Sequence, residues 1–259
     1  MSAGNRRPRI TGRVVSDAVI VVLCLGLIWQ AFYEIAGATA LTPPIATIAY
    51  AMELLGEADF WANVAVTFKA FALAAVISIV CGLLLGLILG LRKLLGDAAE
   101  PVLVALYTIP KVAFYPVILL FFGIGIAAEV AFGVIHGVIP IVIFTMSAVA
   151  NIKPILIKYG RGLGLSFSQL MLTIAIPAAL PEIFTGLRVG FSLTLIGTLL
   201  SEMFGSHAGI GCMLMNAMGL NSVKLIMSLT FLLLLFAALV NSVLLYIDTW
   251  LRHGAHAST

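Results

Sequence analysis

Charged residues are scarce in this sequence. Asp, Glu, Lys and Arg make up 10% of its 259 residues, whereas 62% of the residues are hydrophobic. A soluble globular domain carries about a quarter charged and about half apolar residues. The deficit excludes a soluble domain and indicates an integral membrane protein. The formal net charge of +3 therefore does not point to nucleic acid, and what matters is where the basic residues lie along the chain.

Cysteines and catalytic motifs are also scarce. The three cysteines, Cys24, Cys81 and Cys212, lack the spacing of a metal or redox site, so we expect no disulfide framework and no bound metal. The sequence has no Gly-x4-Gly-Lys-Ser/Thr loop and no nucleophile motif. We therefore expect no catalytic residues, no bound cofactor and no enzymatic activity in this chain.

Long apolar runs dominate what is present. Because about 20 apolar residues cross the hydrocarbon core once, the sequence predicts an all-α polytopic membrane protein. Its single transmembrane domain covers residues 15–250, between an N-terminal segment at 1–14 and a tail at 251–259. Six spans are predicted near Val15–Ala36, Val64–Leu91, Pro101–Phe122, Ala127–Ala150, Pro181–Met203 and Lys224–Trp250.

Basic residues flank these spans on one side. If the spans alternate in direction, all of the flanking basic residues fall on the same side, which the positive-inside rule makes cytoplasmic. Both termini are then cytoplasmic. In the first outer connection, apolar residues at helical spacing over 45–55 predict an interfacial helix. The basic residues in question are Arg6, Arg7, Arg9, Arg13, Arg92, Lys93, Lys153, Lys158, Arg161 and Arg252.

Small residues recur every four positions in two of the spans. Such series allow neighbouring helices to approach closely inside a membrane. The second span has one series, and the fifth span has two, which predicts close neighbours on both flanks of that helix. The series are Gly82, Gly86 and Gly90; Gly186, Gly190, Thr194 and Thr198; and Gly197, Ser201 and Gly205.

Three ionisable residues within the spans are candidates for the solute pathway: Lys111, Arg188 and Glu202. A charge at the bilayer centre costs about 2.5–3.5 kcal/mol on insertion scales, so each should face protein or water. Lys111 either lines the pathway or binds carbonyl groups that Pro110 frees. Arg188 and Glu202 lie about 21 Å apart along a helix and cannot pair with each other. His136, the single histidine of the fourth span, is interpreted as a packed, hydrogen-bonded residue.

A polar, glycine-rich segment at about 151–177 interrupts the apolar pattern. It is too apolar for a disordered loop and has too many glycines for one helix. The sequence predicts two short helices that meet near Gly160 to Gly164, with Ser166 or Ser168 as the cap of the second. A compact helical element that protrudes into the cytoplasm is typical of a docking surface.

The spacing Gly164-x9-Ile174-x-Ile176-Pro177 resembles the later part of the EAA motif, found in permease subunits of binding-protein-dependent ABC importers. Other short motifs resemble the nitrate, sulfonate and taurine branch of that family. These are Leu41-Thr-Pro-Pro44, Ile109-Pro110-Lys111, Pro116, Phe122-Gly-Ile-Gly125, Pro177-Ala-Ala-Leu-Pro181, Gly186-Leu-Arg188, Glu202-Met203 and Gly209-Ile-Gly211.

The resemblance implies a type I ABC importer permease fold in a bacterial inner membrane. It implies a second permease copy, in a homodimer or a heterodimer, two cytoplasmic ATPase subunits that hold ATP and Mg, and an extracytoplasmic solute-binding protein. Membrane lipid surrounds the assembly, and no nucleic acid is involved. A coupling helix in the 151–177 segment would contact the ATPase. Its residues are Lys158, Tyr159, Gly160, Gly164, Ile174, Ile176 and Pro177.

One part of the motif departs from the family. Where the family has Glu-Ala-Ala, this chain has Lys158-Tyr159-Gly160. The acidic residue has become basic, and two small residues have become one large residue and one flexible residue. The expected charge interaction with the ATPase is therefore altered, unless the partner carries a compensating change or a second permease supplies it. The other interpretation is that this part of the motif drifts while the segment from Gly164 to Pro177 keeps its shape.

The expected solute is a small anion such as a sulfonate, taurine or nitrate, because Lys111 and Arg188 lie at membrane depth with few acidic residues. An alternative is a permease for a neutral or cationic molecule such as a thiamine-precursor pyrimidine. An alternative from another class is a secondary transporter driven by an ion gradient. That class favours inverted repeats or paired carboxylates within spans, and the sequence shows neither.

Overall fold

A computed structural model describes residues 11–256, excluding the side chains of 11–16, 18, 167 and 250–256. Most of the N-terminal segment at 1–14 and the end of the 251–259 tail therefore lie outside the described residues. The helices in chain order are α1 (Thr11–Ala36), α2 (Pro44–Leu54), α3 (Ala58–Leu91), α4 (Lys93–Thr108), the 3-10 turn η1 (Lys111–Phe114), α5 (Tyr115–Phe122), α6 (Ile126–Ala150), α7 (Pro154–Gly162), α8 (Phe167–Leu170), the π-helical turn η2 (Met171–Ala175), α9 (Ile176–Gly205), α10 (Ile210–Gly219) and α11 (Val223–His256).

The chain forms two compact units. One contains the residues up to Gly56 together with Ala217–Leu232, and the other contains Glu57–Asn216 together with the residues from Leu233 onward. The long helix α11 contributes its first turns to the smaller unit and the rest to the larger one. The larger unit contains every residue that the sequence assigns to the solute pathway or to ATPase coupling.

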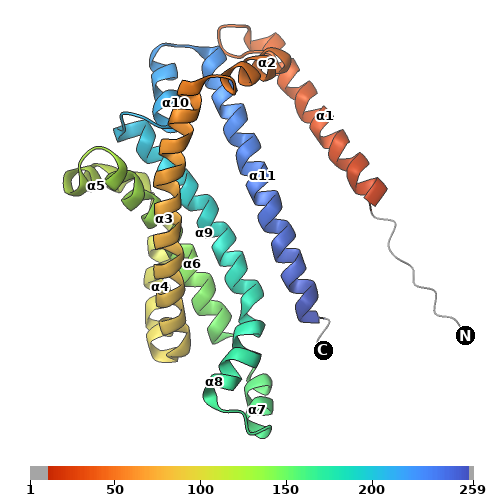
Figure 1. Cartoon of the computed structure of the whole chain (residues 1–259), viewed down its shortest axis with the longest axis vertical. Coiled ribbons are helices and arrows are strands. Elements are labelled where there is room, and N and C mark those ends of the chain that lie inside the picture. The colour runs from red at the N-terminus through yellow and green to blue at the C-terminus, as the bar shows by residue number, and fades with distance from the viewer. Residues whose placement is uncertain (1–10, 257–259) are drawn as a thin grey trace, which may run out of the picture. The chain divides into compact units, whose positions relative to one another are not determined.

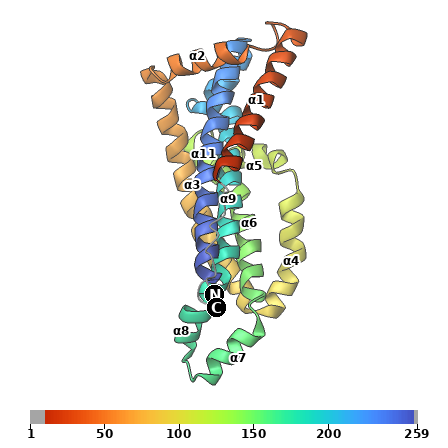
Figure 2. The same ribbon diagram turned by 90° about the vertical axis from the view of Figure 1, so that its right-hand side faces the viewer.

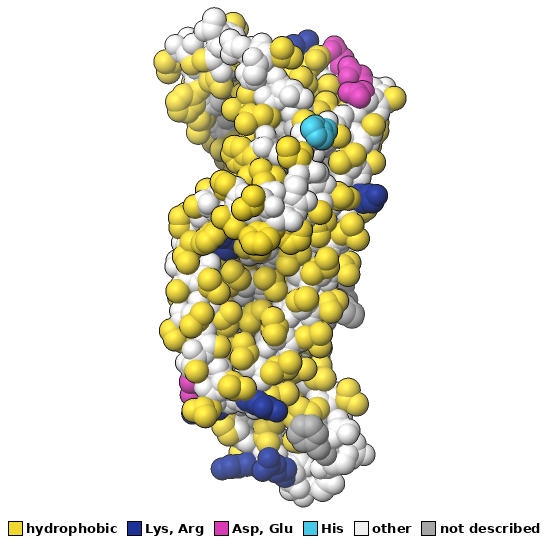
Figure 3. Space-filling model, turned by 90° about the vertical axis from the view of Figure 1, so that its left-hand side faces the viewer, with side chains coloured by type: hydrophobic (Ala, Val, Ile, Leu, Met, Phe, Trp, Pro, Cys, Tyr) yellow, Lys and Arg dark blue, Asp and Glu magenta, His cyan; other side chains and the backbone are white. Residues whose placement is uncertain are grey.

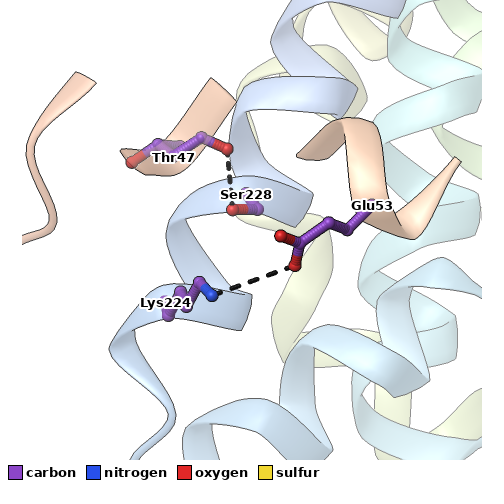
Figure 4. A network of polar contacts seen from close by, with 4 residues as sticks. All are labelled: Thr47, Glu53, Lys224 and Ser228. Atoms are coloured by element: carbon purple, nitrogen blue, oxygen red, sulfur yellow. Dashed lines mark hydrogen bonds and ion pairs between the residues drawn. The ribbon is translucent and has the colours of Figure 1, made fainter. Parts of the chain in front are cut away.

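In the smaller unit, α2 is fastened to the start of α11 by polar contacts (Figure 4). Ser228 Oγ donates a hydrogen bond to the carbonyl oxygen of Thr47 at 3.1 Å, and Lys224 Nζ lies 4.0 Å from a Glu53 carboxylate oxygen. The Lys224 ammonium group also lies 4.1 Å from the centre of the Tyr50 ring. The helix predicted over 45–55 is therefore confirmed, and it has specific partners in this unit.

Five of the six predicted spans are confirmed. Within residues 11–256, five helices are long and apolar enough to cross a membrane, and there is a sixth span if α4 and the pair η1 and α5, bent by 86° at the break between them, count as one. The predicted start of this third span at Pro101 is wrong, because α4 begins at Lys93. Asp97 and Glu100 interrupt the apolar run without ending the helix, and the break comes at Pro110, which follows the last turn of α4.

Helices α3, α6 and α9 pack side by side in the larger unit (Figures 1 and 2). The glycine series of α3 faces α6. A Cβ at Gly86 would lie 2.9 Å from the carbonyl oxygen of Val142, and one at Gly90 would lie 2.8 Å from that of Met146. The predicted close approach along this series is confirmed.

Both small-residue series of α9 also have close neighbours. A Cβ at Gly190 would lie 2.9 Å from the carbonyl oxygen of Gly137 in α6, whereas one at Gly205 would meet the Tyr115 hydroxyl at the start of α5. Gly197 packs against the ring of His136, whose Nδ1 lies 2.9 Å from the carbonyl oxygen of Phe132. The predictions of two packed flanks and of a hydrogen-bonded, buried histidine are confirmed.

The surface agrees with a membrane location. Figure 3 shows hydrophobic side chains over most of the visible face, with several Lys and Arg side chains near its lower end and a few others higher up. The helix α5 exposes large apolar side chains, with Leu120 83% and Phe121 78% exposed. Apolar surface of this extent requires lipid or protein to cover it.

Candidate functional site

The segment between α6 and α9 forms a compact protrusion. Helices α7 and α8 extend beyond the ends of α6 and α9 in both ribbon views (Figures 1 and 2). Helix α7 ends in a Schellman motif, in which the Leu165 amide donates to the Gly160 carbonyl at 3.2 Å and the Gly164 amide donates to that of Arg161 at 3.0 Å. Gly164 has a φ of +70°, which glycine adopts at the lowest cost. The turn at the end of α7 therefore requires Gly164, the glycine of the EAA-like motif.

A capping box begins the second short helix. The Ser166 amide donates to the Gln169 side-chain oxygen at 2.9 Å, and the Gln169 amide donates to Ser166 Oγ at 3.4 Å. This reciprocal pair satisfies two of the amide groups that a helix start leaves without partners. The predictions of two short helices and of Ser166 as the cap are confirmed.

The three residues that depart from the family motif have different environments. Lys158 and Tyr159 are exposed, and Gly160 is buried. A Cβ at Gly160 would meet the ends of the Leu170 and Ile174 side chains, so this position lets α7 pack closely on α8 and η2. The departure thus affects the surface at two positions and the internal packing at one. Beyond η2, Ile176 and Pro177 are exposed at the start of α9.

Glu202 lies inside the protein, with 1% of its surface exposed. Its Oε2 accepts hydrogen bonds from Thr67 Oγ1 in α3 and from the Gly211 amide, each at 2.9 Å. Thr67 Oγ1 in turn accepts a hydrogen bond from the Ile210 amide at 2.9 Å. We refer to Thr67, Glu202 and the first residues of α10, Ile210 and Gly211, as the α10 clasp.

The clasp has a clear physical role. The first amide groups of a helix have no partner within it and favour an acceptor or a negative charge. Here the acceptors come from two other helices, α3 and α9, so the clasp joins three helices. The partners that Glu202 was expected to find outside its own helix are therefore Thr67 and Gly211. This placement puts the carboxylate in the protein interior rather than on an accessible surface.

Sequence reasoning missed Thr67, and it also missed Asn63, whose Oδ1 accepts a hydrogen bond from the Gly209 amide at 2.7 Å. Both residues are polar and lie four positions apart at the start of α3, so they share one face of that helix. That spacing was the available signal. The contact between Thr67 and Glu202 joins residues 135 positions apart, and no local pattern could pair them.

Lys111 lies at the break between α4 and α5 and is partly exposed. Its Nζ donates a hydrogen bond to the carbonyl oxygen of Tyr107 at 3.0 Å and lies 5.1 Å from the centre of the Tyr107 ring. The Tyr107 carbonyl is one that the end of α4 leaves without a helical partner. The geometry thus favours the structural interpretation of Lys111, in which it caps a broken helix.

Two other cations lie within the spans. Arg188 in α9 is partly buried, and Lys69 in α3 is exposed. Among the residues that the structure describes, neither side chain has a hydrogen-bond or ion-pair partner. Lys69 was missed at the sequence level, although a single lysine inside the apolar run 64–91 is the kind of residue that marks a solute path. Because its side chain is exposed and has no partner among the described residues, Lys69 is a candidate for the solute pathway, as is Arg188.

Residues 78–255 match the family described as binding-protein-dependent transport system inner membrane component. The chain belongs to this family. It is 26% identical over 192 residues to the putative aliphatic sulfonates transport permease protein SsuC of Bacillus subtilis, which covers 73% of this chain and 70% of that protein. As a member of this family the chain is a permease subunit of a transport system, and not an enzyme.

Other relatives have related transport names. The chain is 28% identical over 209 residues to the nitrate import permease protein NrtB of Synechococcus elongatus, with 76% and 75% of the two chains covered. It is 29% identical over 196 residues to the formylaminopyrimidine transport permease protein ThiX of Halalkalibacterium halodurans, with 75% and 78% covered. SsuC and NrtB support the nitrate, sulfonate and taurine branch that the motifs indicate, whereas the name of ThiX corresponds to the alternative solute.

The fold is also similar to a solved structure. An inward-facing MetNI methionine ABC transporter chain matches with a TM-score of 0.58 and 20% identity, over 77% of this chain and 97% of that one. The likeness confirms the type I ABC importer permease fold. The family match and the long apolar helices show that the chain is a multi-pass inner-membrane protein.

Proposed function

We propose that this chain forms the translocation path of an ATP-driven importer for a small anionic solute of the sulfonate or nitrate kind. The observation that carries the substrate class is an asymmetry among the ionisable residues at membrane depth. Lys69 and Arg188 have accessible surface, whereas Glu129 and Glu202 are each 1% exposed. Of these four side chains, only the two cations are accessible, so a solute that moves past them meets positive charge.

The relatives support this choice. Aliphatic sulfonates and nitrate, named for SsuC and NrtB, are small anions. A cation at membrane depth is costly unless it faces water, protein or a counter-ion, and a transported anion would supply that counter-ion transiently. Glu202 then acts through the α10 clasp, and Lys111 stabilises the end of α4.

The proposed assembly contains a second permease copy, two cytoplasmic ATPase subunits that hold ATP and Mg, and an extracytoplasmic solute-binding protein. Both termini and the protrusion of α7 and α8 face the cytoplasm in this arrangement. The family description, which names a binding protein, supports the last of these partners. The basic residues near α7 support the orientation through the positive-inside rule.

Motion driven by the ATPase would be transmitted to the translocation path along α9. This helix follows η2 without a break and carries Glu202 near its other end, so it joins the protrusion to the α10 clasp. A displacement of α7 and α8 by the ATPase would therefore reach the far end of the unit through one continuous helical element. Such rigid-body motion between two arrangements is how alternating access works.

A second candidate solute is a neutral or cationic pyrimidine, because ThiX is named for formylaminopyrimidine transport. Such a solute would gain nothing from Lys69 and Arg188. Removal of these charges should therefore lower the uptake of an anion and leave the uptake of the pyrimidine unchanged.

The experiment is uptake by cells that express the chain with its partner subunits, supplied with labelled alkanesulfonate, taurine, nitrate or formylaminopyrimidine. We expect uptake of one anion, and we expect Lys69→Met and Arg188→Gln each to lower it by about tenfold, equivalent to about 1.4 kcal/mol. Lys93→Met, at the start of α4, is the control and should leave uptake unchanged. Anion uptake that both pathway variants leave intact would remove these residues from the site, and uptake of the pyrimidine alone would favour the second candidate.

A further inference from the structure

Two buried glutamates lie where the start of α6 meets the end of α9. The Gly125 amide, just before α6, donates a hydrogen bond to the carbonyl oxygen of Gly205 at the end of α9, at 3.2 Å. Glu129 follows Gly125 by four residues and Glu202 precedes Gly205 by three, so each lies about one helical turn from this contact. Their carboxyl groups are close enough to interact electrostatically. We refer to Glu129 and Glu202 as the acidic pair.

Each member of the acidic pair has one oxygen atom without a partner. Both residues are 1% exposed. Among the described residues, neither Oε2 of Glu129 nor Oε1 of Glu202 has a hydrogen-bond partner, and both atoms are buried. Buried polar atoms without partners are costly and uncommon in native proteins. The two oxygen atoms therefore indicate a ligand that the surrounding side chains do not supply.

The hydrogen-bond donors near the acidic pair are already in use. The donors of the α10 clasp bind only Oε2 of Glu202. The Tyr115 hydroxyl donates to the carbonyl oxygen of Ser201 at 2.8 Å. The hydroxyl of Ser206, beside the other glutamate, donates to the carbonyl oxygen of Ala208 at 2.7 Å. These groups have no hydrogen left for the two oxygen atoms.

Among the residues that the structure describes, no cation forms an ion pair with the acidic pair. The other titratable or charged side chains close to it on the packed elements are Lys69 in α3, Lys111 in η1, Tyr115 in α5, His136 in α6, His207 after α9 and Cys212 in α10. Lys111, His136 and Cys212 each contact a backbone carbonyl oxygen, and Lys69 and His207 are exposed. Two neighbouring carboxyl groups in a protein interior without a counter-ion do not both ionise.

We propose that the acidic pair binds one proton and that this proton joins α6 to α9. Water supplies the proton, which forms an O–H bond at Glu129 Oε2 and is donated as a hydrogen bond to Glu202 Oε1. Glu202 is the acceptor because its other oxygen already receives two hydrogen bonds, which favour an ionised carboxylate. The pair then carries one negative charge in place of two, and a single hydrogen satisfies both oxygen atoms.

A metal ion is the competing ligand. Metal sites need several oxygen, nitrogen or sulfur ligands, and no group of three Asp, Glu, His or Cys side chains that could hold an ion occurs in the described part of the chain. A shared proton needs only the two oxygen atoms. The inference concerns a contact between two helices, so it does not depend on which solute the permease carries.

The first test is infrared spectroscopy of the purified full-length permease in nanodiscs at neutral pH. We expect the wild type to show the carbonyl band of a protonated carboxylic acid, which shifts in D2O. Glu129→Gln and Glu202→Gln should each lose this band, because the amide group supplies the shared hydrogen permanently. Glu100→Gln, at an exposed position of α4, is the matched control and should keep the band.

The second test is the pH dependence of the melting temperature. Glutamates of the unfolded chain are ionised above about pH 4.3, whereas the folded acidic pair keeps its proton. The folded chain therefore binds about one proton more, and its stability falls as the pH rises until the pair loses that proton. We expect the melting temperature of the wild type to fall between about pH 6 and about pH 9. Both glutamine variants of the pair should reduce this fall, and Glu100→Gln should not.

Three results would overturn the proposal. The first is a wild-type spectrum without the band, or a band that the folded glutamine variants of the pair retain. The second is a melting temperature that Na⁺, K⁺ or Ca²⁺ raises in the wild type and not in these variants, which would assign the pair to a metal ion. The third applies even if neither variant folds: a band that persists in the wild type over the pH range in which stability is lost.

Discussion

The α10 clasp and the protrusion of α7 and α8 lie near opposite ends of α9, and they differ in how many of their polar and apolar groups have partners within the chain. In the clasp, Glu202 is 1% exposed and takes hydrogen bonds from two other elements of the chain. In the protrusion, Tyr159 is 66% exposed, and the exposed Lys153, Lys158 and Arg161 have no acidic partner in the segment. The chain itself supplies the partners of Glu202 Oε2, although the buried Oε1 has none among the described residues, whereas the protrusion has the features of a surface that a partner completes.

Because of this difference, we expect the clasp to determine the stability of the permease and the protrusion to determine its coupling to the ATPase. Substitutions in the packed interior, including the clasp, should lower the thermal stability of the permease and affect transport only as a consequence. Substitutions in the protrusion should leave the folded permease intact and lower the ATPase activity that depends on it. Variants from the two regions therefore test whether stability and coupling depend on different parts of the protein.

The largest expected effect is in the interior, at Gly137 of α6. A Cβ there would lie 2.9 Å from the carbonyl oxygen of Gly190 and 3.1 Å from Ser78 Oγ, and would collide with the Thr194 hydroxyl. Overpacking a core costs about 1–3 kcal/mol and sometimes more, and the backbone carbonyl cannot rotate away. We expect Gly137→Val to abolish the monodisperse peak in fluorescence-detected size-exclusion chromatography. Gly26→Val, with open space at its Cβ, should preserve it.

The second-largest effect, a loss of thermal stability, is expected at the α10 clasp. Glu202→Ala removes the acceptor of Thr67 and Gly211 and leaves buried donors unsatisfied, which costs about 1–3 kcal/mol. We expect a clear fall in the melting temperature of the purified protein. Glu202→Gln keeps an oxygen at the same place and should recover most of the stability and the uptake. Normal stability with lost uptake in Glu202→Gln would instead place the carboxylate in the solute pathway.

A smaller effect is expected in the protrusion, at Gly164. Alanine in a left-handed conformation costs about 1–2 kcal/mol, so Gly164→Ala should loosen the turn between α7 and α8. We expect ATPase activity stimulated by the binding protein to fall, while the melting temperature of the permease stays close to that of the wild type. Gly162→Ala, where nothing lies near the added methyl group, serves as the control and should keep the activity.

The smallest effect is expected at Ser166. Ser166→Ala removes one half of the capping box, and loss of such a cap costs about 0.5–2 kcal/mol of local helix stability. We expect a modest loss of stimulated ATPase activity, and Ser166→Asp, which can still accept the Gln169 amide, should restore it. If Ser166→Ala instead lowered global stability as much as Glu202→Ala, the protrusion and the interior would not be separate in the way described here.

The features that sequence reasoning predicted correctly are those with a local pattern. The four-residue series that contains Gly82 and the one that contains Gly190 indicated close helix packing because residues at that spacing share a face. Ser166 was one of two candidates for the cap of the second short helix because serine is favoured at that position. Five of the spans followed from the length of the apolar runs.

The features that sequence reasoning missed depend on tertiary contacts or on what surrounds a residue. Nothing near Thr67 in the sequence indicates Glu202, which lies 135 positions away. The exposure of Lys69 could not be assigned before the packed face of α3 was known. The start of α4 was placed too late because hydropathy marks the apolar part of a helix, whereas the helix itself also includes Asp97 and Glu100.

The most direct test of the account is solute accumulation by proteoliposomes that contain this permease and its ATPase, with the loaded binding protein on the opposite side. We predict accumulation of a small anion that requires ATP on the ATPase side and continues when ionophores collapse the ion gradients. Accumulation by the permease alone that needs no ATP and stops with an ionophore would contradict the account and identify a secondary transporter.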